Sequence, residues 1–563
     1  MTDSAENFNW SPAAASTRPD QAVRRWLGSH FARFAPLVVA CIAALQTSYL
    51  VTWSIRELTE RGVAMDDSFF YAVLTNNYAR VGYWTFDGNM PTNGVQPLWQ
   101  WLMIGLHQML PNVEIMRSSF VANWMLYVLF CWLIVRYVLR LGARHAPALV
   151  IVSLLLTCNP GFQRIVLCGL EVPLFLVCFA TLLNTLEYLD QRWKAGVSAW
   201  HALLLAASSA LTFLARTDWF WVVPLSAAFV WSRTERRTLL LLFIGMVSAL
   251  VLPYLLHNLI AHEHLMPVSG RAKLALLERH APNLWDYLRS GEWHGVFSML
   301  GGMFTLEQLW LSIPLTVGLA WVGQRRFSAR PASIRFLLLG VACHTLFMHL
   351  AYREVRSYTR YYFSVEGIAA TYLLAEVVVI AMGWLRRRVT PARFAWGCYA
   401  TTCAGILLSL GATLAFRFAA PERKWVWRWQ MGETLRTLPS DAKIAAFWPG
   451  LFAYVSGRSV FPLDGIVGSE FYLDAVVLKG NELVYARSRG IDYVVINDLP
   501  PSSVYGKQPP KVSSWAEVGK LRLWQDCAFV KGLVASHGEP SKSNGWFLYE
   551  LSELPNRSRC ERL

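Results

Sequence analysis

Charged residues are scarce in this sequence. Asp, Glu, Lys and Arg make up 16% of its 563 residues, whereas a soluble globular domain carries about 25%. Hydrophobic residues reach 55%, the mean hydropathy is +0.33, and many of these residues stand in long uninterrupted runs. Such runs exclude an ordinary cytosolic protein, and the same composition excludes a mostly disordered chain. The composition therefore predicts a protein that spans a membrane many times.

Familiar motifs of soluble enzymes are also lacking. No CxxC, HExxH, Walker or GxGxxG pattern stands in a context that would give it meaning. The polar residues 1–33 have neither a short apolar core nor a cleavage site, which argues against a removable signal peptide. Cysteines lie mostly in or beside apolar runs, where they act as small hydrophobic residues. Cys527 and Cys560 do not, and they could form a disulfide in an oxidising compartment.

About eleven apolar runs approach the length needed to cross a bilayer, which is about 20 residues. They cover residues 34–53, 118–138, 146–157, 172–189, 201–215, 219–231, 239–260, 300–322, 336–349, 363–385 and 394–416. The run 97–110 is too short to span, and we interpret it as an interfacial helix. From residue 421 onward the apolar runs become short and alternating, with Gly and Pro turns between them.

The excess of basic residues follows the connections between these runs. The net charge is +15, which could suggest nucleic acid, but the positive residues fall in alternate connections, and this is the positive-inside pattern. We therefore expect no nucleic-acid partner, a cytoplasmic N-terminus and, with an odd number of spans, an external C-terminus. The basic connections contain Arg136, Arg140 and Arg144; Arg192; Arg233, Arg236 and Arg237; Arg325, Arg326 and Arg330; and Arg386, Arg387, Arg388 and Arg393.

The expected architecture is an α-helical polytopic membrane protein with a small external domain. Residues 1–33 would be a cytoplasmic segment, and 34–417 a transmembrane domain whose first outer loop is 57–117. Residues 418–563 would form an extracytoplasmic α/β domain.

Two adjacent carboxylates, Asp66 and Asp67, open the first outer loop at what looks like the start of a helix. Either could cap free N–H groups. Adjacent helical residues point about 100° apart, so one could cap while the other faces a cavity and takes a proton from an acceptor hydroxyl. The pair could instead bind a divalent cation, although two ligands do not make a site.

Other unusual polar residues fall on the same outer side, where ionisable groups at membrane depth usually line a cavity. Glu171 and Asp218 could pair with Arg216 or another outer arginine, or could bind sugar hydroxyls. The segment 269–273 offers a hydroxyl, a flexible glycine and two cations to a phosphate ester, or its cations could reach lipid headgroups. Trp99 suits a membrane belt or packing more than a sugar platform.

Together these motifs resemble the GT-C superfamily of integral membrane glycosyltransferases, especially the branch like the mycobacterial arabinofuranosyltransferases. The similarity runs from about residue 60 to about 500, and each motif alone is weak. The segments that carry it, in order, are 66–71, 85–88, 92–99, 169–171, 216–218, 267–273, 447–450, 459–465 and 490–493. The segment 94–98 reads Gly-Val-Gln-Pro-Leu where that branch carries a Gly-Tyr-Thr-Ser-Pro-Leu type of sequence, so the resemblance does not extend to the sugar.

The resemblance implies an enzyme that uses polyprenyl-phosphate sugars on the periplasmic or lumenal face and inverts the anomeric carbon. The acceptor would be a glycan, a lipid or a protein, and the location a bacterial inner membrane. Asp66 or Asp67 would be the catalytic carboxylate, with a slight preference for Asp66. Ser269, Arg271, Lys273 and Arg360 would hold the donor phosphate, and Asn93, Gln96, Trp99, Glu171, Arg216 and Asp218 would bind sugar or acceptor.

Two other classes of function compete with this one. A transporter or flippase of lipid-linked sugars should show polar residues near mid-bilayer and repeated halves, and the sequence shows neither. A non-catalytic scaffold would not need Asp66, Asp67 and Lys273. The sequence therefore favours the enzyme, with no certain cofactor and with a divalent cation left open.

Overall fold

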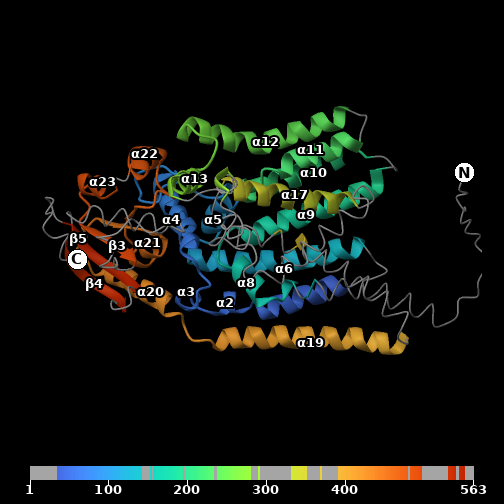
Figure 1. Ribbon diagram of the computed structural model, residues 1–563, viewed down its shortest axis with the longest axis horizontal. Helices are drawn as coiled ribbons and strands as arrows, with labels where there is room; N and C mark the ends of the chain where they lie inside the picture. The colour runs from blue at the N-terminus through green and yellow to red at the C-terminus, as the bar shows by residue number, and fades with distance from the viewer. Residues whose placement is uncertain are drawn as a thin grey trace, which may run out of the picture.

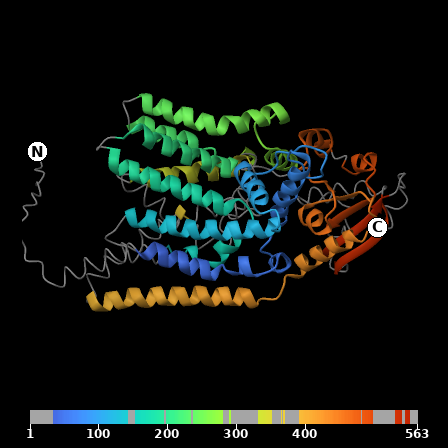
Figure 2. The ribbon, with the colours of Figure 1, turned by 180° about the vertical axis from the view of Figure 1, so that it is seen from behind.

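The computed structural model describes residues 34–141, 153–154, 156–193, 197–233, 237–280, 289–291, 331–351, 365, 368–369, 391–479, 482–497, 530–539 and 544–551. Within these ranges, long apolar helices run side by side, and a sheet with short helices lies at one end of them (Figure 1). The view from behind shows the same division (Figure 2). Arg360, Cys527 and Cys560 lie outside the described residues.

Three helices in the described ranges are long and apolar enough to cross a membrane: α6 (Ile115–Leu141), α9 (Val172–Arg192) and α12 (Arg237–His262). They confirm the helices expected at 118–138, 172–189 and 239–260. A fourth span results if α19 (Pro391–Phe418) and α20 (Arg423–Arg436), which are bent relative to each other, count as one. The expected number of eleven spans is not confirmed, because run 300–322 and most of 146–157 and 363–385 are not described.

The helix neighbours explain which faces are apolar. Helix α9 packs between α6 and α10 (Ala199–Ala215), and α10 packs in turn on α12. Helix α9 is therefore mostly buried, whereas α12 turns Leu241, Ile244 and Ile260 outward. Outward leucines and isoleucines suit contact with lipid. The remaining helices of this layer are the segment Phe34–Gln46, α2 (Tyr49–Thr52), α8 (Pro160–Val166), α11 (Val222–Arg233) and α17 (Ala332–Ala351).

The first outer loop is mainly helical. It contains α3 (Ile55–Glu60), α4 (Asp66–Val81) and α5 (Pro97–Met109). Helix α4 ends at Gly82, whose φ of +81° is the left-handed conformation that glycine adopts without strain. Helix α5 begins at Pro97, where the missing N–H is not needed. The helix expected at 97–110 is thus present, and it packs on α4, α6 and α10.

The C-terminal domain, defined here as α20 and everything after it, is built on a mixed sheet. Its strands are β1 (Ile444–Ala446), β2 (Val460–Pro462), β3 (Tyr493–Asn497), β4 (Val530–Glu539) and β5 (Asn544–Leu551). The order is β2-β1-β3-β5-β4; β1 pairs in parallel with β2 and β3, and β5 pairs antiparallel with β3 and β4. Helices α21 (Gly450–Ser456), α22 (Glu470–Ala475) and α23 (Glu482–Ser488) connect the strands. This is the α/β arrangement expected for the tail.

The C-terminal domain docks on the first outer loop through α21, which packs against α4 and α20. Gly450, the first residue of α21, makes this approach possible. A Cβ at this position would lie 2.4 Å from the backbone oxygen of Asp66 and 2.8 Å from the ring of Phe70. The backbones of two segments almost 400 residues apart are therefore in direct contact at a position where any side chain would overlap with α4.

Gly450→Ala should destabilise the protein, because overpacking of this kind costs about 1–3 kcal/mol. The measurement is the thermal unfolding midpoint of the purified protein in detergent. Gly105→Ala in α5 is the matched control, since nothing lies within 4 Å of the added methyl group. There the substitution should stabilise the helix by about 0.5–1 kcal/mol. An equal loss in both variants would contradict the docking contact.

Candidate functional site

Asp66 joins the first outer loop to the C-terminal domain. Its carboxylate accepts the backbone N–H groups of Leu451 at 2.8 Å and Gly450 at 3.4 Å, and it pairs with the guanidinium of Arg428 at 2.5 Å. Gly450 and Leu451 open α21, and the first N–H groups of a helix need outside acceptors. The sequence predicted that one aspartate of the pair could cap the helix that starts beside it, but Asp66 instead caps α21, 385 residues further along the chain. The cap residue of α4 itself, Met65, makes no side-chain capping bond.

Arg428, the partner of Asp66, is almost wholly buried in aromatic rings. Its Cζ lies 4.6 Å from the ring centre of Trp546, 5.2 Å from that of Phe452 and 5.5 Å from that of Trp425. A guanidinium is well suited to such stacking because it is planar and weakly hydrated. It also donates to the backbone oxygen of Trp448 at 2.5 Å. Sequence reasoning missed Arg428 because nothing near it in the chain distinguishes it.

Trp448 carries an unusual backbone conformation beside this pair. Its φ is +50°, a region that a bulky side chain rarely enters. The conformation is held from both sides, since its N–H donates to Asp464 at 3.2 Å and its carbonyl accepts from Arg428. Segments 447–450 and 459–465 belong to the sequence resemblance, which assigned them no role. The first supplies the N–H of Gly450 to Asp66, and the second holds the first in place through the bond between Asp464 and Trp448.

Burial raises the pKa of two carboxyl groups here, Asp66 and Asp464. It raises the pKa of Asp66 to about 7, although Arg428 and the N–H groups of Leu451 and Gly450 oppose the rise. Burial likewise raises the pKa of Asp464 to about 7, and the nearby charges of Asp66 and Asp67 add to the effect. Both carboxyl groups therefore titrate near neutral pH.

Asp67 occupies a different environment, although it is the next residue. It is half-buried, whereas Asp66 is buried. Its charge raises the pKa of Asp66 and of Asp464, so it lies close to both. Of the two adjacent aspartates, Asp67 is the one with access to solvent.

A chain of hydrogen bonds runs from α4 to the turn after α10. The hydroxyl of Tyr71 donates to Glu171 at 3.1 Å and accepts the N–H of Gln96 at 3.1 Å. The side-chain oxygen of Gln96 in turn accepts the N–H of Thr217 at 2.9 Å and its hydroxyl at 3.2 Å. Four segments, at the starts of α4, α5 and α9 and after α10, are therefore linked by side chains that the sequence places far apart.

The turn after α10 holds a buried ion pair. Arg216, fully buried, donates to Asp218 at 3.1 Å and 2.8 Å in a two-point contact, which gives an arginine–carboxylate pair its strength. Of the two expectations for Asp218, pairing with Arg216 is confirmed. Glu171 bonds to Tyr71 instead.

A cavity of about 400 Å³ brings several of the expected residues together. Its polar side consists of Gln96, Thr217, Asp218, Ser269 and Lys273, which come from the first outer loop, the turn after α10 and α13 (Val268–His280). The rest of its wall is apolar, with Phe213, Phe220, Leu255, Leu265 and Phe347. The cavity therefore combines polar side chains and the cation Lys273 with a largely apolar lining.

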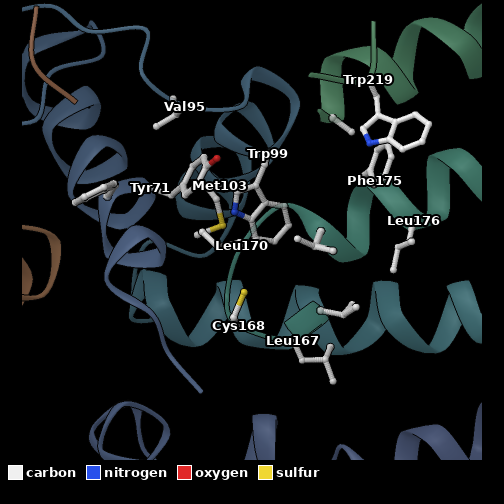
Figure 3. Close-up of a cluster of buried hydrophobic side chains, with 14 of the residues drawn as sticks. Tyr71, Val95, Trp99, Met103, Leu167, Cys168, Leu170, Phe175, Leu176 and Trp219 are labelled. Carbon is white, nitrogen blue, oxygen red and sulfur yellow. The ribbon is translucent and has the colours of Figure 1, made fainter. Parts of the chain in front are cut away.

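Other expected site residues serve the fold. Asn93 accepts the N–H of Val268 at 2.8 Å and so anchors the start of α13. Trp99 is fully buried, and Figure 3 draws it within a hydrophobic cluster that also contains Tyr71, Met103 and Leu170. It offers no exposed face on which a sugar could stack. Gly169 closes the turn before Glu171, where a Cβ would lie 3.0 Å from both Ser68 and Phe120.

Arg271 points away from the cavity. Its guanidinium bonds to Glu470 and, at 3.0 and 3.2 Å, to the two carboxylate oxygens of Asp474. Both carboxylates belong to α22, so Arg271 makes a second link between the transmembrane layer and the C-terminal domain. It is not among the residues that line the cavity.

One group of residues has the spacing of a metal site. In the described part of the chain, ligand atoms of His264, Glu470 and Asp474 all lie within 4.8 Å of one another. Arg271 already binds both carboxylates, however, and supplies the positive charge that a cation would bring. The group therefore does not fit a metal ion while this ion pair is formed.

The pH dependence of stability tests the burial of Asp66. A carboxyl group whose pKa rises on folding, here from 3.8 to about 7, binds its proton more tightly in the folded state. Its stabilising contribution is fully present below the unfolded pKa and is lost as the pH rises through 7. We expect the unfolding midpoint of the wild type to fall between about pH 5 and about pH 8. Asp66→Asn should show a shallower fall, with Asp464 and Glu470, whose pKa burial also raises to about 7, contributing to what remains.

Thermal unfolding in detergent over this pH range measures the effect. Asp441→Asn, which removes an exposed carboxylate of the same domain, should leave the slope unchanged. A wild-type midpoint that rises with pH, or equal slopes for wild type and Asp66→Asn, would contradict the assignment.

Comparison of this structure with solved structures finds proteins of similar fold. No protein-family model matches the sequence, and no curated protein matches it. A crystal structure of the oligosaccharyltransferase of Archaeoglobus fulgidus in the apo form aligns with a TM-score of 0.50 and 13% identity, over 93% of this chain and 75% of the archaeal chain. A complex of the oligosaccharyltransferase AglB from that organism with an inhibitory peptide and a dolichol-phosphate gives 0.49 and 13%, over 92% and 74%. A complex with Zn and sulfate gives 0.47 and 14%, over 92% and 73%.

At this level of identity the likeness concerns the fold alone. It supports a fold of the GT-C type, as the sequence resemblance implied, in a multi-pass membrane protein. These structures are oligosaccharyltransferases, so they give no support to the arabinofuranosyltransferase-like branch. This chain therefore shares the overall fold of the archaeal oligosaccharyltransferase.

Proposed function

We propose that this protein is a membrane glycosyltransferase that moves a sugar from a polyprenyl-phosphate donor to an extracytoplasmic acceptor. The observation that supports this most is the cavity whose lining combines Lys273 and other polar side chains with apolar ones. A polyprenyl-phosphate sugar likewise combines an anionic head with a long hydrocarbon chain. The sugar could be arabinofuranose, and the acceptor a glycan, a lipid or a protein.

The donor would lie with its phosphate at α13. Lys273 supplies a positive charge and Ser269 a hydroxyl donor, and both line the cavity. As the bond to the sugar breaks, negative charge builds up on the phosphate, and a fixed cation in a place shielded from water stabilises it strongly. Phe220, Leu255 and Leu265, which also line the cavity, would contact the isoprenoid chain.

The base would be Asp67. Both oxygens of Asp66 already hold backbone N–H groups, and Arg428 binds there too, so Asp66 acts as a positioning residue at the start of α4. Asp67 would remove the proton from the acceptor hydroxyl. The freed oxygen attacks the anomeric carbon from the face opposite the phosphate, the carbon–oxygen bond to the phosphate breaks, and polyprenyl phosphate leaves with the electron pair. The configuration at the sugar is inverted.

The orientation proposed for the protein follows the positive-inside pattern. Segment 1–33 would be cytoplasmic, domain 34–417 would cross the membrane about eleven times, and domain 418–563 would be external. In a bacterial inner membrane this places Asp67, Lys273 and the C-terminal domain on the periplasmic side.

A transfer assay on purified protein in lipid, with a panel of radiolabelled polyprenyl-phosphate sugars and an envelope extract as acceptor, tests the role of Asp67. Asp67→Asn should lower kcat by about 10²–10⁴, the usual contribution of a general base, with an unchanged unfolding midpoint. Asp66→Asn should change stability and its pH dependence more than kcat. Loss of transfer in Asp66→Asn alone, at unchanged stability, would reverse the two roles. Saturable binding or trans-bilayer movement of the donor without transfer by the wild type would instead indicate a flippase.

Lys273→Gln tests the donor site in the same assay. Removal of a charge-assisted contact to a phosphate should weaken donor use by about tenfold or more in kcat/KM. Lys424→Gln, at an exposed lysine of α20, is the matched control and should leave kcat/KM unchanged. An unchanged Lys273→Gln enzyme would exclude this cavity as the donor site.

A further inference from the structure

A second cavity lies where the first outer loop meets the C-terminal domain. Its volume is about 710 Å³. One wall is the turn after α4, with Asp87, Asn89 and Met90, and it is fastened to the C-terminal domain because the hydroxyl of Ser459 donates to the carbonyl of Asp87 at 2.5 Å. The other walls are the segments that lead into β1, β2 and β3. It shares no lining residue with the cavity proposed for the donor.

Three cations line this groove, namely Lys443, Arg458 and Arg489. Each is held by neutral acceptors. Lys443 donates to the carbonyl of Arg489 at 3.2 Å, Arg458 donates to the carbonyl of Pro439 at 2.6 Å, and Arg489 donates to the hydroxyl of Tyr485. In the portion of the chain that the structure describes, none of the three forms a salt bridge with a carboxylate. Their positions are therefore set without a direct ion pair to a described carboxylate.

Two carboxylates, Asp87 and Asp441, also line the groove, and Asp87 already accepts hydrogen bonds from within the protein. Asp87 is buried and accepts the N–H groups of Asn89 and Met90 and the hydroxyl of Thr85. Asp441 is exposed, and it has the acceptor oxygens that bind sugar hydroxyls. The groove thus combines a net positive charge with hydroxyl-binding groups, Asn89, Ser440 and Asp441 among them.

The apolar residues of the groove do not suit a lipid surface. Ile444, Phe461 and Ile491 are buried, and Met90 is half-buried. Among the described residues, the large hydrophobic side chains that stand out into solvent lie elsewhere. The lining therefore offers nothing that would insert between lipids.

We propose that this groove binds an anionic saccharide, a sugar segment that carries carboxylate groups, as part of the acceptor. This rests on the proposed transferase function, because the groove borders the same outer loop that carries Asp67. Lys443 and Arg489 contact the negative groups, and Asp441 and Asn89 contact the hydroxyls. The acceptor would bridge the first outer loop and the C-terminal domain.

Binding measured by calorimetry on the full-length protein in detergent tests this without any transfer step. The probes are trigalacturonate, which is anionic, and maltotriose, a neutral trisaccharide. Trigalacturonate should bind saturably, more weakly as salt is added, and maltotriose should bind at least about tenfold more weakly. The double variant Lys443→Gln/Arg489→Gln should lose about tenfold or more in trigalacturonate affinity. Lys479→Gln, at an exposed lysine of the same domain, is the matched control and should leave it unchanged.

Three results would overturn the proposal: no saturable binding of trigalacturonate, equal affinity for the two trisaccharides, or an affinity that the double variant leaves unchanged. Binding of glycerol phosphate without binding of trigalacturonate would overturn it in favour of a lipid headgroup site. The thermal unfolding midpoint of the double variant should match the wild type, since both side chains are exposed. Calorimetry measures binding without any transfer step. Failure of the saccharide site and failure of the proposed transferase activity therefore give different results.

Discussion

The buried contact between Asp66, Arg428 and the first N–H groups of α21 is the constraint on which the outer half of the protein depends. A charge pair removed from water is stable only when its remaining donors and acceptors are satisfied, and loss of one partner costs about 3–5 kcal/mol. Here the carboxylate is satisfied by two backbone N–H groups and the guanidinium. The guanidinium donates to the carboxylate and to a carbonyl and stacks on aromatic rings, while its buried Nε has no hydrogen-bond partner among the described residues. This contact sets the position of α4, and therefore of Asp67 and Tyr71 on the same helix.

Helix geometry explains why residues that are neighbours in the sequence contact different parts of the protein. Successive residues in a helix point about 100° apart, so Asp66 turns into the C-terminal domain while Asp67 remains half-buried. Arg271 and Lys273 are two positions apart in α13, so their side chains point to nearly opposite sides of the helix, about 160° apart. One binds the carboxylates of α22, and the other lines the cavity. Residues that form one motif in the sequence therefore serve two different surfaces.

The first outer loop stands between two binding regions of different character. On one side the amphipathic cavity meets Gln96, and on the other the cationic groove meets Asp87 and Asn89. Two ionic links, Asp66 with Arg428 and Arg271 with Asp474, hold the C-terminal domain against this loop and α13. The proposed transfer brings a donor from the membrane and an acceptor from outside together at Asp67, which belongs to this same loop.

The apolar runs alone sufficed to predict the membrane class, the helices α6, α9 and α12, the interfacial helix α5 and an α/β tail, because burial in lipid or in a core leaves a periodic pattern along the chain. The polar motifs and the family resemblance selected Gln96, Asp218, Ser269 and Lys273 as candidates, and all four line one cavity. The roles of Asp66, Arg271, Asn93 and Trp99 depended on partners that only folding brings near. Asp66 meets α21 across 385 residues and Arg271 meets Glu470 across 199. Hydrogen bonds and ion pairs act over about 3 Å, so a side chain's role follows from its neighbours in space, and no local pattern in the sequence records them.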